Sequence, residues 1–309
     1  MTDIMGKMDI AFPHLHIYLS NVPKSISVFG FQIAFYGIII ALGVFLGFML
    51  ASKEGKRLGQ PDDLWWDFSI FAIIFSVIGA RAYFVIFSWD LYKDNPLQIF
   101  NIRNGGLAIY GGAIAGFLTL FVFSKIKKQS FFSMADAGVF GLLLGQIIGR
   151  WGNFMNRECF GGYTDNLLAM RLPIEMVRSS DISPDIASHI VEGTNYIQVH
   201  PTFLYESCLN LILLLIMWAY RKHKKFDGEM VLWYLGGYGI IRFFVEGLRT
   251  DQLQIGQTGI AVSQMLGGIL FVASLLAAIV LHVRLYRKQK LQSAGGGNVG
   301  ETISTEKES

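Results

Sequence analysis

The sequence predicts an all-α integral membrane protein with seven transmembrane helices and a small extracytoplasmic subdomain. Three observations lead to this fold class. The 309 residues are 52% hydrophobic and only 16% charged, whereas soluble domains carry about 25% charged residues. Seven apolar runs are long enough to be candidates for crossing a bilayer as helices. Lysine and arginine gather in alternate connections between these runs, and this bias sets the orientation of a membrane protein.

The apolar runs define the predicted helices in chain order. They are 28–51, 64–88, 105–124, 133–150, 201–220, 229–246 and 259–283. The first run is about 24 residues long, which exceeds the apolar core of a signal peptide, so we expect it to be retained as a span. The fourth and sixth runs are short and rich in glycine. Small residues spaced by four favour close packing between membrane helices.

The connections between the runs fall into two sets. The set 52–63, 125–130, 221–228 and 284–290 holds 14 Lys and Arg in 33 residues. The set 1–28, 89–104, 151–200 and 247–258 holds 8 in 106 residues. Basic connections stay in the cytoplasm. Seven spans then place the N-terminus outside and the C-terminus inside.

The domain organisation follows from these spans. We expect residues 1–27 to form an extracytoplasmic arm and residues 28–283 to form the helical domain, with 151–200 as an outer subdomain. Residues 284–309 are expected to be a basic cytoplasmic tail that is disordered from 291 onward. In the arm, an apolar group is expected to lie along the membrane interface: Phe12, Leu15, Ile17, Tyr18 and Leu19.

Charged residues inside the predicted spans share one depth. They are Arg81, Arg150, Glu206, Arg242 and Glu246. The topology puts all of them within roughly 10 Å of the outer interface. Together with Arg249 and Glu158 they suggest a cationic surplus at that level. Intramembrane charge is costly and marks functional sites, and arginine there favours a phosphate ligand. Purely structural ion pairs, such as Arg242 with Glu246, are the alternative.

Further polar residues reach the same level. The segment 149–161 reads Gly-Arg-Trp-Gly-Asn-Phe-Met-Asn-Arg-Glu-Cys-Phe-Gly. It supplies Arg150, Asn153, Asn156, Glu158 and Gly161. Tyr36 lies in the outer half of the first span, Tyr110 lies between two glycine pairs in 105–112, and His200 opens 200–206.

Cysteine content and net charge exclude other classes of site. Cys159 and Cys208 have no metal-ligand spacing, so we expect no metal. Cys159 could be a nucleophile, although its motif contains no histidine. The net charge of +3 requires no nucleic-acid partner.

Taken together, the motifs resemble those of the prolipoprotein diacylglyceryl transferase family. The resemblance rests on segments in the order of that family: Gly105–Gly112, Arg150–Gly161, His200-Pro-Thr-Phe-Leu-Tyr-Glu206, and Arg242-Phe-Phe-Val-Glu-Gly-Leu-Arg249 followed by Asp251. Some family members carry histidine where this chain has Tyr110.

The resemblance implies an activity. The diacylglyceryl group of phosphatidylglycerol would move to the thiol of a lipobox cysteine in a preprolipoprotein signal peptide, and glycerol-1-phosphate would leave. It implies no cofactor. It also implies a multi-pass protein of the bacterial cytoplasmic membrane whose active site faces the extracytoplasmic side.

The residues receive expected roles on this basis. Arg150 and Arg242 would bind the phosphate and stabilise its growing charge. Asn153, Asn156 and Glu158 would bind the glycerol hydroxyls, and Glu246 and Arg249 would organise the head group or the path of the peptide. Tyr110 would orient the thiol or take its proton through water, with His200 as the alternative base. Tyr36 and Gly161 complete the expected substrate-binding set.

Two other functions fit the composition. A transporter or scramblase of an anionic lipid would need polar residues in the inner halves of the spans, where Asp67 and Asp136 lie near helix ends. A non-catalytic membrane subunit would not need Arg150 for turnover.

Overall fold

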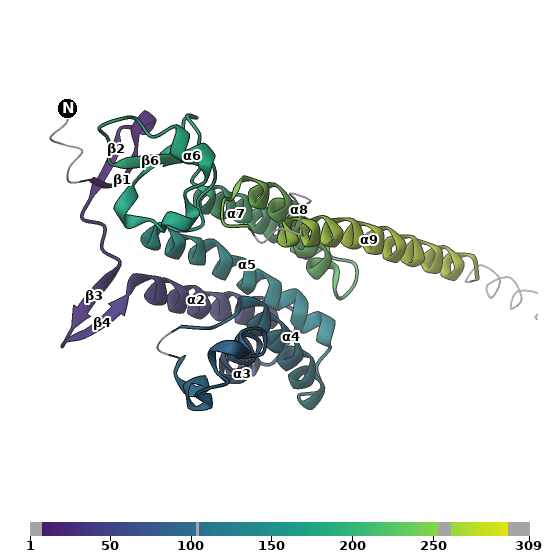
Figure 1. Cartoon of the computed structure of the whole chain (residues 1–309). Coiled ribbons are helices and arrows are strands. Elements are labelled where there is room, and N and C mark those ends of the chain that lie inside the picture. Colours follow the sequence, from purple (N-terminus) through teal and green to yellow (C-terminus); the bar gives the residue numbers. More distant parts are fainter. Residues whose placement is uncertain (1–7, 103–104, 253–260, 296–309) are drawn as a thin grey trace, which may run out of the picture.

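The computed structural model describes residues 8–102, 105–252 and 261–295. It contains a bundle of long helices with strands gathered at one end (Figure 1). The long helices are α2 (Phe35–Arg57), α3 (Leu64–Phe87), α4 (Ile109–Ile126), α5 (Phe131–Asn156), α7 (Thr202–Tyr220), α8 (Glu229–Leu248) and α9 (Val262–Gly295). The strands are β1 (Met8–Phe12), β2 (Ile17–Ser20), β3 (Ser25–Val28), β4 (Phe31–Ala34), β5 (Met170–Pro173) and β6 (Tyr196–Val199).

Short helices occupy the connections. They are η1 (Pro13–Leu15), η2 (Trp89–Leu91), η3 (Pro96–Phe100), η5 (Ile174–Met176), η6 (Ser179–Asp181), α6 (Pro184–Ser188) and η7 (Arg221–His223).

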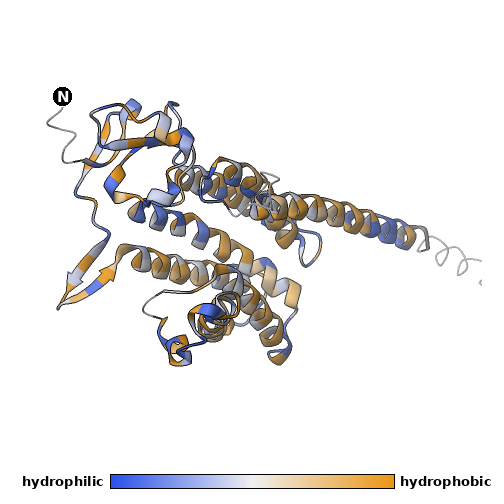
Figure 2. Cartoon of the chain, in the orientation of Figure 1, coloured by the Kyte–Doolittle hydropathy of each residue, from blue (hydrophilic) through white to orange (hydrophobic). Residues whose placement is uncertain are grey.

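Six of the long helices in the described part of the chain are long and apolar enough to cross a membrane, and α8 is the long helix outside that group. α8 spans 20 residues and includes Glu229, Arg242 and Glu246. It packs against α9, α7 and α5, so these charges lie against other helices. The predicted class of an all-α, multi-pass membrane protein is confirmed. In Figure 2 the helices are largely apolar, and the far end of α9 turns hydrophilic.

The connections lie alternately at the two ends of the bundle, as predicted. Gly161 forms a β-bridge with Arg249 at the end that carries the strands. At the opposite end Asp67, at the start of α3, pairs with Lys127 after α4 at 2.6 Å. Glu54 near the end of α2 pairs there with Arg221. The basic connections 52–63, 125–130 and 221–228 therefore share one end of the molecule.

The start of the first span was predicted wrongly. Residues 28–34 are apolar but form part of the antiparallel pair β3–β4, and α2 begins only at Phe35. Phe29 (φ 49°) and Gly30 (φ 82°) form the turn, and two successive positive φ values match the right-handed twist of a hairpin. Hydrophobicity alone does not reveal this turn, because the residues around it are apolar.

The N-terminal arm is part of the outer subdomain. A four-stranded sheet has the order β2-β1-β5-β6, so the arm pairs with residues far along the chain. Phe12 is buried in the core of this subdomain beside Leu172 and Val199, which contradicts the predicted interfacial position. Leu19 packs at the edge of the same core, while Leu15, Ile17 and Tyr18 are exposed.

Two other boundaries differ from prediction. α5 continues to Asn156, so the outer subdomain begins after that residue. α9 continues to Gly295, which makes residues 284–295 helical. The predicted disorder of residues 296–309 lies outside the described residues.

Candidate active site

One buried carboxylate joins three helices at the end of the bundle that carries the strands. Glu206 on α7 is 1% exposed. Its Oε1 accepts hydrogen bonds from Arg150 Nη2 on α5 at 2.8 Å and from the Tyr238 hydroxyl on α8 at 3.3 Å. Its Oε2 accepts one from Arg242 Nη1 on α8 at 3.1 Å. A buried carboxylate is tolerated when it is paired and hydrogen-bonded in this way.

The network continues along α8 into the loop that follows it. Arg242 Nη2 also bonds Glu246 Oε2, and Glu246 accepts a longer bond from Arg249 Nη1 at 3.5 Å. Arg249 donates hydrogen bonds to Asp251 from Nε at 2.9 Å and from Nη2 at 2.8 Å. Burial alone would raise the pKa of Asp251, but the two hydrogen bonds from Arg249 hold it below its ordinary value.

These contacts change the predicted charge of the site. Arg150, Arg242 and Arg249 face the three carboxylates of Glu206, Glu246 and Asp251. The prediction of a cationic surplus is therefore wrong. Arg81 has its partners in the connection between α3 and α4, and the predicted site left out Asp251. The sequence Arg249-Thr-Asp251, which places the carboxylate two residues after an arginine, could have indicated Asp251. Tyr238 was also missed, although it lies four residues before Arg242 on the same face of α8.

The end of α5 places the amide groups of the 149–161 motif. Arg150 Nη1 donates to Asn153 Oδ1 at 3.1 Å. Asn153 Nδ2 donates to Glu158 Oε1 at 3.0 Å, and Asn156 Nδ2 donates to the same oxygen at 3.2 Å. The helix stops because Arg157 adopts a left-handed conformation (φ 57°), which turns the chain and brings Glu158 back over the last turn.

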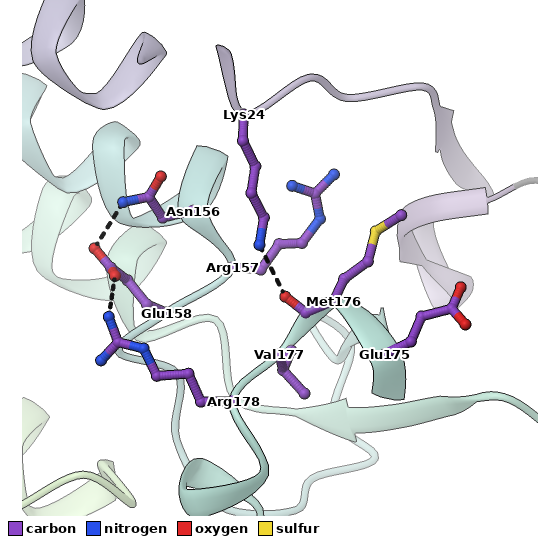
Figure 3. Close-up of a pocket in the computed structure, with 8 residues that line it drawn as sticks. All are labelled: Lys24, Asn156, Arg157, Glu158, Glu175, Met176, Val177 and Arg178. Atoms are coloured by element: carbon purple, nitrogen blue, oxygen red, sulfur yellow. Dashed lines mark hydrogen bonds and ion pairs between the residues drawn. The ribbon is translucent and has the colours of Figure 1, made fainter. Parts of the chain in front are cut away.

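A polar pocket opens beside Glu158 (Figure 3). Its volume is about 290 Å³, and its walls are Lys24, Asn156, Arg157, Glu158, Glu175, Met176, Val177 and Arg178. Arg178 Nη2 approaches Glu158 Oε2 at 3.5 Å, and Lys24 Nζ donates to the Met176 carbonyl at 3.1 Å. Glu158 therefore links the arginine network to a pocket of the outer subdomain.

Gly161 holds together the segment after α5, the start of α7 and the end of α8. Its N–H donates to the His200 carbonyl at 3.0 Å. A Cβ at this position would lie 2.7 Å from the Leu248 carbonyl oxygen and 2.8 Å from the His200 Cβ. Only glycine permits this close approach, so the structure gives Gly161 a packing role beside the substrate-binding role expected from the motif.

Comparison with known proteins decides the family. A family model described as prolipoprotein diacylglyceryl transferase matches residues 23–280. The chain belongs to this family. Three relatives are named phosphatidylglycerol–prolipoprotein diacylglyceryl transferase. The protein of Clostridioides difficile strain 630 is 40% identical over 264 residues, which cover 85% of this chain and 95% of the relative. That of Finegoldia magna is 41% identical, covering 86% and 96%, and that of Bacillus cytotoxicus is 42% identical, covering 85% and 94%.

In this prolipoprotein diacylglyceryl transferase family member, two candidate bases lie apart from the arginine network. His200 Nδ1 lies 3.2 Å from the Tyr205 hydroxyl, which in turn accepts a hydrogen bond from Asn166 at 3.0 Å. Burial lowers the pKa of His200. Tyr110 is in the first turn of α4 and 49% exposed. Among the described residues, neither side chain has a hydrogen bond to Arg150, Arg242 or Glu206.

Tyr36 and Cys159 lie close to the motif. A Cβ on Gly152 would lie 2.8 Å from the Tyr36 ring, and Tyr36 is within electrostatic range of Glu158 and Arg150. Asn153 Nδ2 lies 3.6 Å from the Cys159 sulfur. Burial raises the pKa of the Cys159 thiol to about 11. The thiol is thus protonated at neutral pH, which argues against the nucleophile alternative.

The carboxylates at the opposite end of the bundle, which a transport path would use, already have partners. Asp136 accepts hydrogen bonds from Lys224 Nζ at 2.8 Å and from the Gly228 and Val231 amides at 2.9 and 3.1 Å. Asp67 pairs with Lys127. These carboxylates connect helix ends, so they do not support the transporter alternative.

Proposed function

We propose that this chain transfers the diacylglyceryl group of phosphatidylglycerol to the thiol of a lipobox cysteine in a preprolipoprotein, at the extracytoplasmic face of the bacterial cytoplasmic membrane. One observation carries the proposal. Two arginines from different helices, Arg150 and Arg242, are fixed beside each other by the buried Glu206. Family membership supports the same reaction.

The arginines suit a phosphate ester. Glu206, Asn153 and Glu246 occupy some of the N–H groups of Arg150 and Arg242. A guanidinium has five N–H donors, so others remain for the phosphate oxygens. The carboxylate also offsets the repulsion between the two cations, which keeps the site organised before lipid binds. Preorganised donors of this kind stabilise charge that develops in a transition state.

The reaction balances without a cofactor. The thiolate sulfur forms a bond to the terminal glyceryl carbon of the diacylglyceryl group. The bond from that carbon to the phosphate oxygen breaks, and its electron pair goes to the phosphate. Glycerol-1-phosphate leaves, and the thiol proton passes to a base. Arg150 and Arg242 bind the phosphate on which the charge grows.

The thiol proton needs an acceptor. A cysteine thiol has a pKa of about 8.5, so a minor fraction is thiolate at neutral pH. The arginine network is balanced by its own carboxylates, and so it favours the thiolate less than a cationic pocket would. A side chain that accepts the thiol proton as a base therefore becomes more important for the reaction. His200 has a lowered pKa and is neutral at pH 7, so it can accept a proton, while Tyr110 orients the thiol or relays the proton through water.

The glycerol head group fits the polar end of the motif. Asn153, Asn156 and Glu158 form one hydrogen-bonded set next to the open pocket. These side chains can bind the two free hydroxyls of phosphatidylglycerol. The basic connections at the opposite end of the bundle favour an extracytoplasmic location for this set.

The test uses the purified chain in detergent with labelled phosphatidylglycerol and a synthetic lipobox peptide. We expect the mass of the peptide to increase by one diacylglyceryl group, and a peptide with serine in place of the cysteine to remain unmodified. An unmodified cysteine peptide, together with movement of labelled lipid across reconstituted vesicles, would support the transporter alternative instead.

A further inference from the structure

Arg81 was expected in the phosphate site, but the structure directs it elsewhere. It lies on α3, about 9 Å from the outer end of that helix, and is 7% exposed. Its Nε donates to the Ile99 carbonyl at 2.7 Å. Nη1 donates to the carbonyls of Gly105 and Gly106, both at 2.9 Å. Nη2 donates to those of Gln98 and Asn101 at 2.7 and 3.2 Å.

These contacts use the full donor capacity of the side chain. Arginine has five N–H donors and no acceptor, and each donor here meets a backbone carbonyl. The Arg81 guanidinium also lies 5.1 Å from the centre of the Tyr92 ring. No donor is left for a phosphate, so the function of this charge must be structural or positional.

The five carbonyls come from two segments of the connection between α3 and α4. Gln98, Ile99 and Asn101 lie at the end of η3, and Gly105 and Gly106 precede α4. Arg81 therefore joins these two segments of the connection through their backbone carbonyls.

The first glycine pair of the 105–112 motif is explained by Arg81. Gly105 and Gly106 have φ values of 83° and 78°. A Cβ on Gly106 would lie 2.4 Å from Arg81 Nη1. Two residues closer to α4, the Ala108 amide donates to the Ala80 carbonyl at 3.0 Å. Two neighbouring residues of α3 thus fix the backbone immediately before Ile109, where α4 begins.

We propose that Arg81 is a positioning residue for Tyr110. By holding the carbonyls before α4, Arg81 sets where this helix starts and thereby where the Tyr110 ring lies in its first turn. Arg81 itself touches no substrate. The inference rests on the proposed transfer reaction, in which Tyr110 handles the thiol.

The first experiment compares Arg81→Lys and Arg81→Gln. A lysine ammonium has three donors and a glutamine amide has two, so they can satisfy only part of the carbonyl set. Since misplacement of a catalytic group lowers turnover, we expect kcat to fall roughly tenfold or more, with glutamine worse than lysine. KM for phosphatidylglycerol should stay unchanged. Lys93→Gln is the matched control, because Lys93 lies in the same connection and pairs with the exposed Asp90, and it should retain wild-type kcat.

A double-mutant cycle tests whether Arg81 acts through Tyr110. The double variant Arg81→Gln, Tyr110→Phe should have a kcat no lower than that of the slower single variant, because both changes disable the same group. Gly106→Ala, which disturbs the contact without removing the charge, should reproduce the kcat loss if Arg81→Gln does not fold. Melting curves in detergent identify variants that fail to fold.

The outcomes separate the two proposals. A wild-type chain that modifies no peptide overturns the proposed function. With an active wild type, each of three results overturns the role of Arg81: losses that multiply in the double variant, a rise in KM in place of a fall in kcat, or wild-type rates in folded Arg81→Gln or Tyr110→Phe.

Discussion

Glu206 on α7 and Arg150 on α5 form an ion pair of 2.8 Å in which the carboxylate is almost completely buried. The pair joins two helices that are separated in the sequence by residues 157–201. Because Glu206 also binds Arg242, one carboxylate sets the spacing of both arginines that we assign to the phosphate. The predictions below begin with this pair.

Arg150→Lys tests the arginine side of the pair. Lysine keeps the charge but cannot bind Glu206, Asn153 and a phosphate at once with a planar fork. We expect turnover to fall more than tenfold, equivalent to more than about 1.4 kcal/mol of transition-state stabilisation. The rate of peptide modification measures it. Near-normal turnover in a normally expressed variant would show that the charge is structural.

Glu206→Gln tests the carboxylate side. Glutamine has a similar shape but no charge, so Arg150 and Arg242 would repel each other across a buried site. We expect both a lower melting temperature and a loss of turnover of roughly tenfold or more. Tyr238→Phe is the control, since it removes only the 3.3 Å hydrogen bond to Glu206 and should cost about 1 kcal/mol of stability. Equal effects of the two substitutions would argue against a charge-based role.

Cys159→Ser should leave turnover within about threefold of the wild type, because a thiol that is protonated at neutral pH is a poor nucleophile. The pKa of Cys159, raised to about 11 by burial, also predicts slow alkylation at pH 7.5, roughly two orders of magnitude below a free cysteine. Rates with iodoacetamide, followed by mass spectrometry, measure this. Rapid alkylation coupled to loss of activity would reopen the nucleophile alternative.

His200 predicts the pH dependence. Burial lowers its pKa below the ordinary value of 6.5, so the folded protein favours the neutral ring. Its contribution to stability is then present above about pH 6.5 and is lost as pH falls through the lowered pKa. If His200 accepts the thiol proton, kcat/KM should fall over the same acid range. His200→Gln should remove this acid limb and lower kcat about a hundredfold or more. An unchanged limb in that variant would assign the base to another group.

Orientation can be measured with single cysteines in a Cys159→Ser, Cys208→Ser background. Asp185 and His223 are both exposed, the first in the outer subdomain and the second at the basic end of the bundle. We expect Asp185→Cys to react with an impermeant thiol reagent in intact cells, and His223→Cys to react only after the membrane is opened. The reverse pattern would place the arginine network on the cytoplasmic side.

The sequence by itself determined the membrane class and the approximate positions of the long helices, and it predicted one depth for the charged residues. These properties are local, because hydrophobicity over a helix length decides whether a segment can cross a bilayer. Charge inside such a segment is conspicuous for the same reason. Arg150, Glu206 and Arg242 could therefore be assigned to one level from their distance to the helix ends.

Only the tertiary structure decided which partners these charges have. Arg81 and Arg150 look alike in sequence, yet one binds five backbone carbonyls and the other binds Glu206. The hairpin β3–β4 and the pairing of β1 with β5 were also hidden, since they depend on turn geometry and on contacts between distant segments. Hydropathy gives the depth of a side chain but not its direction around the helix, and direction determines which group it meets.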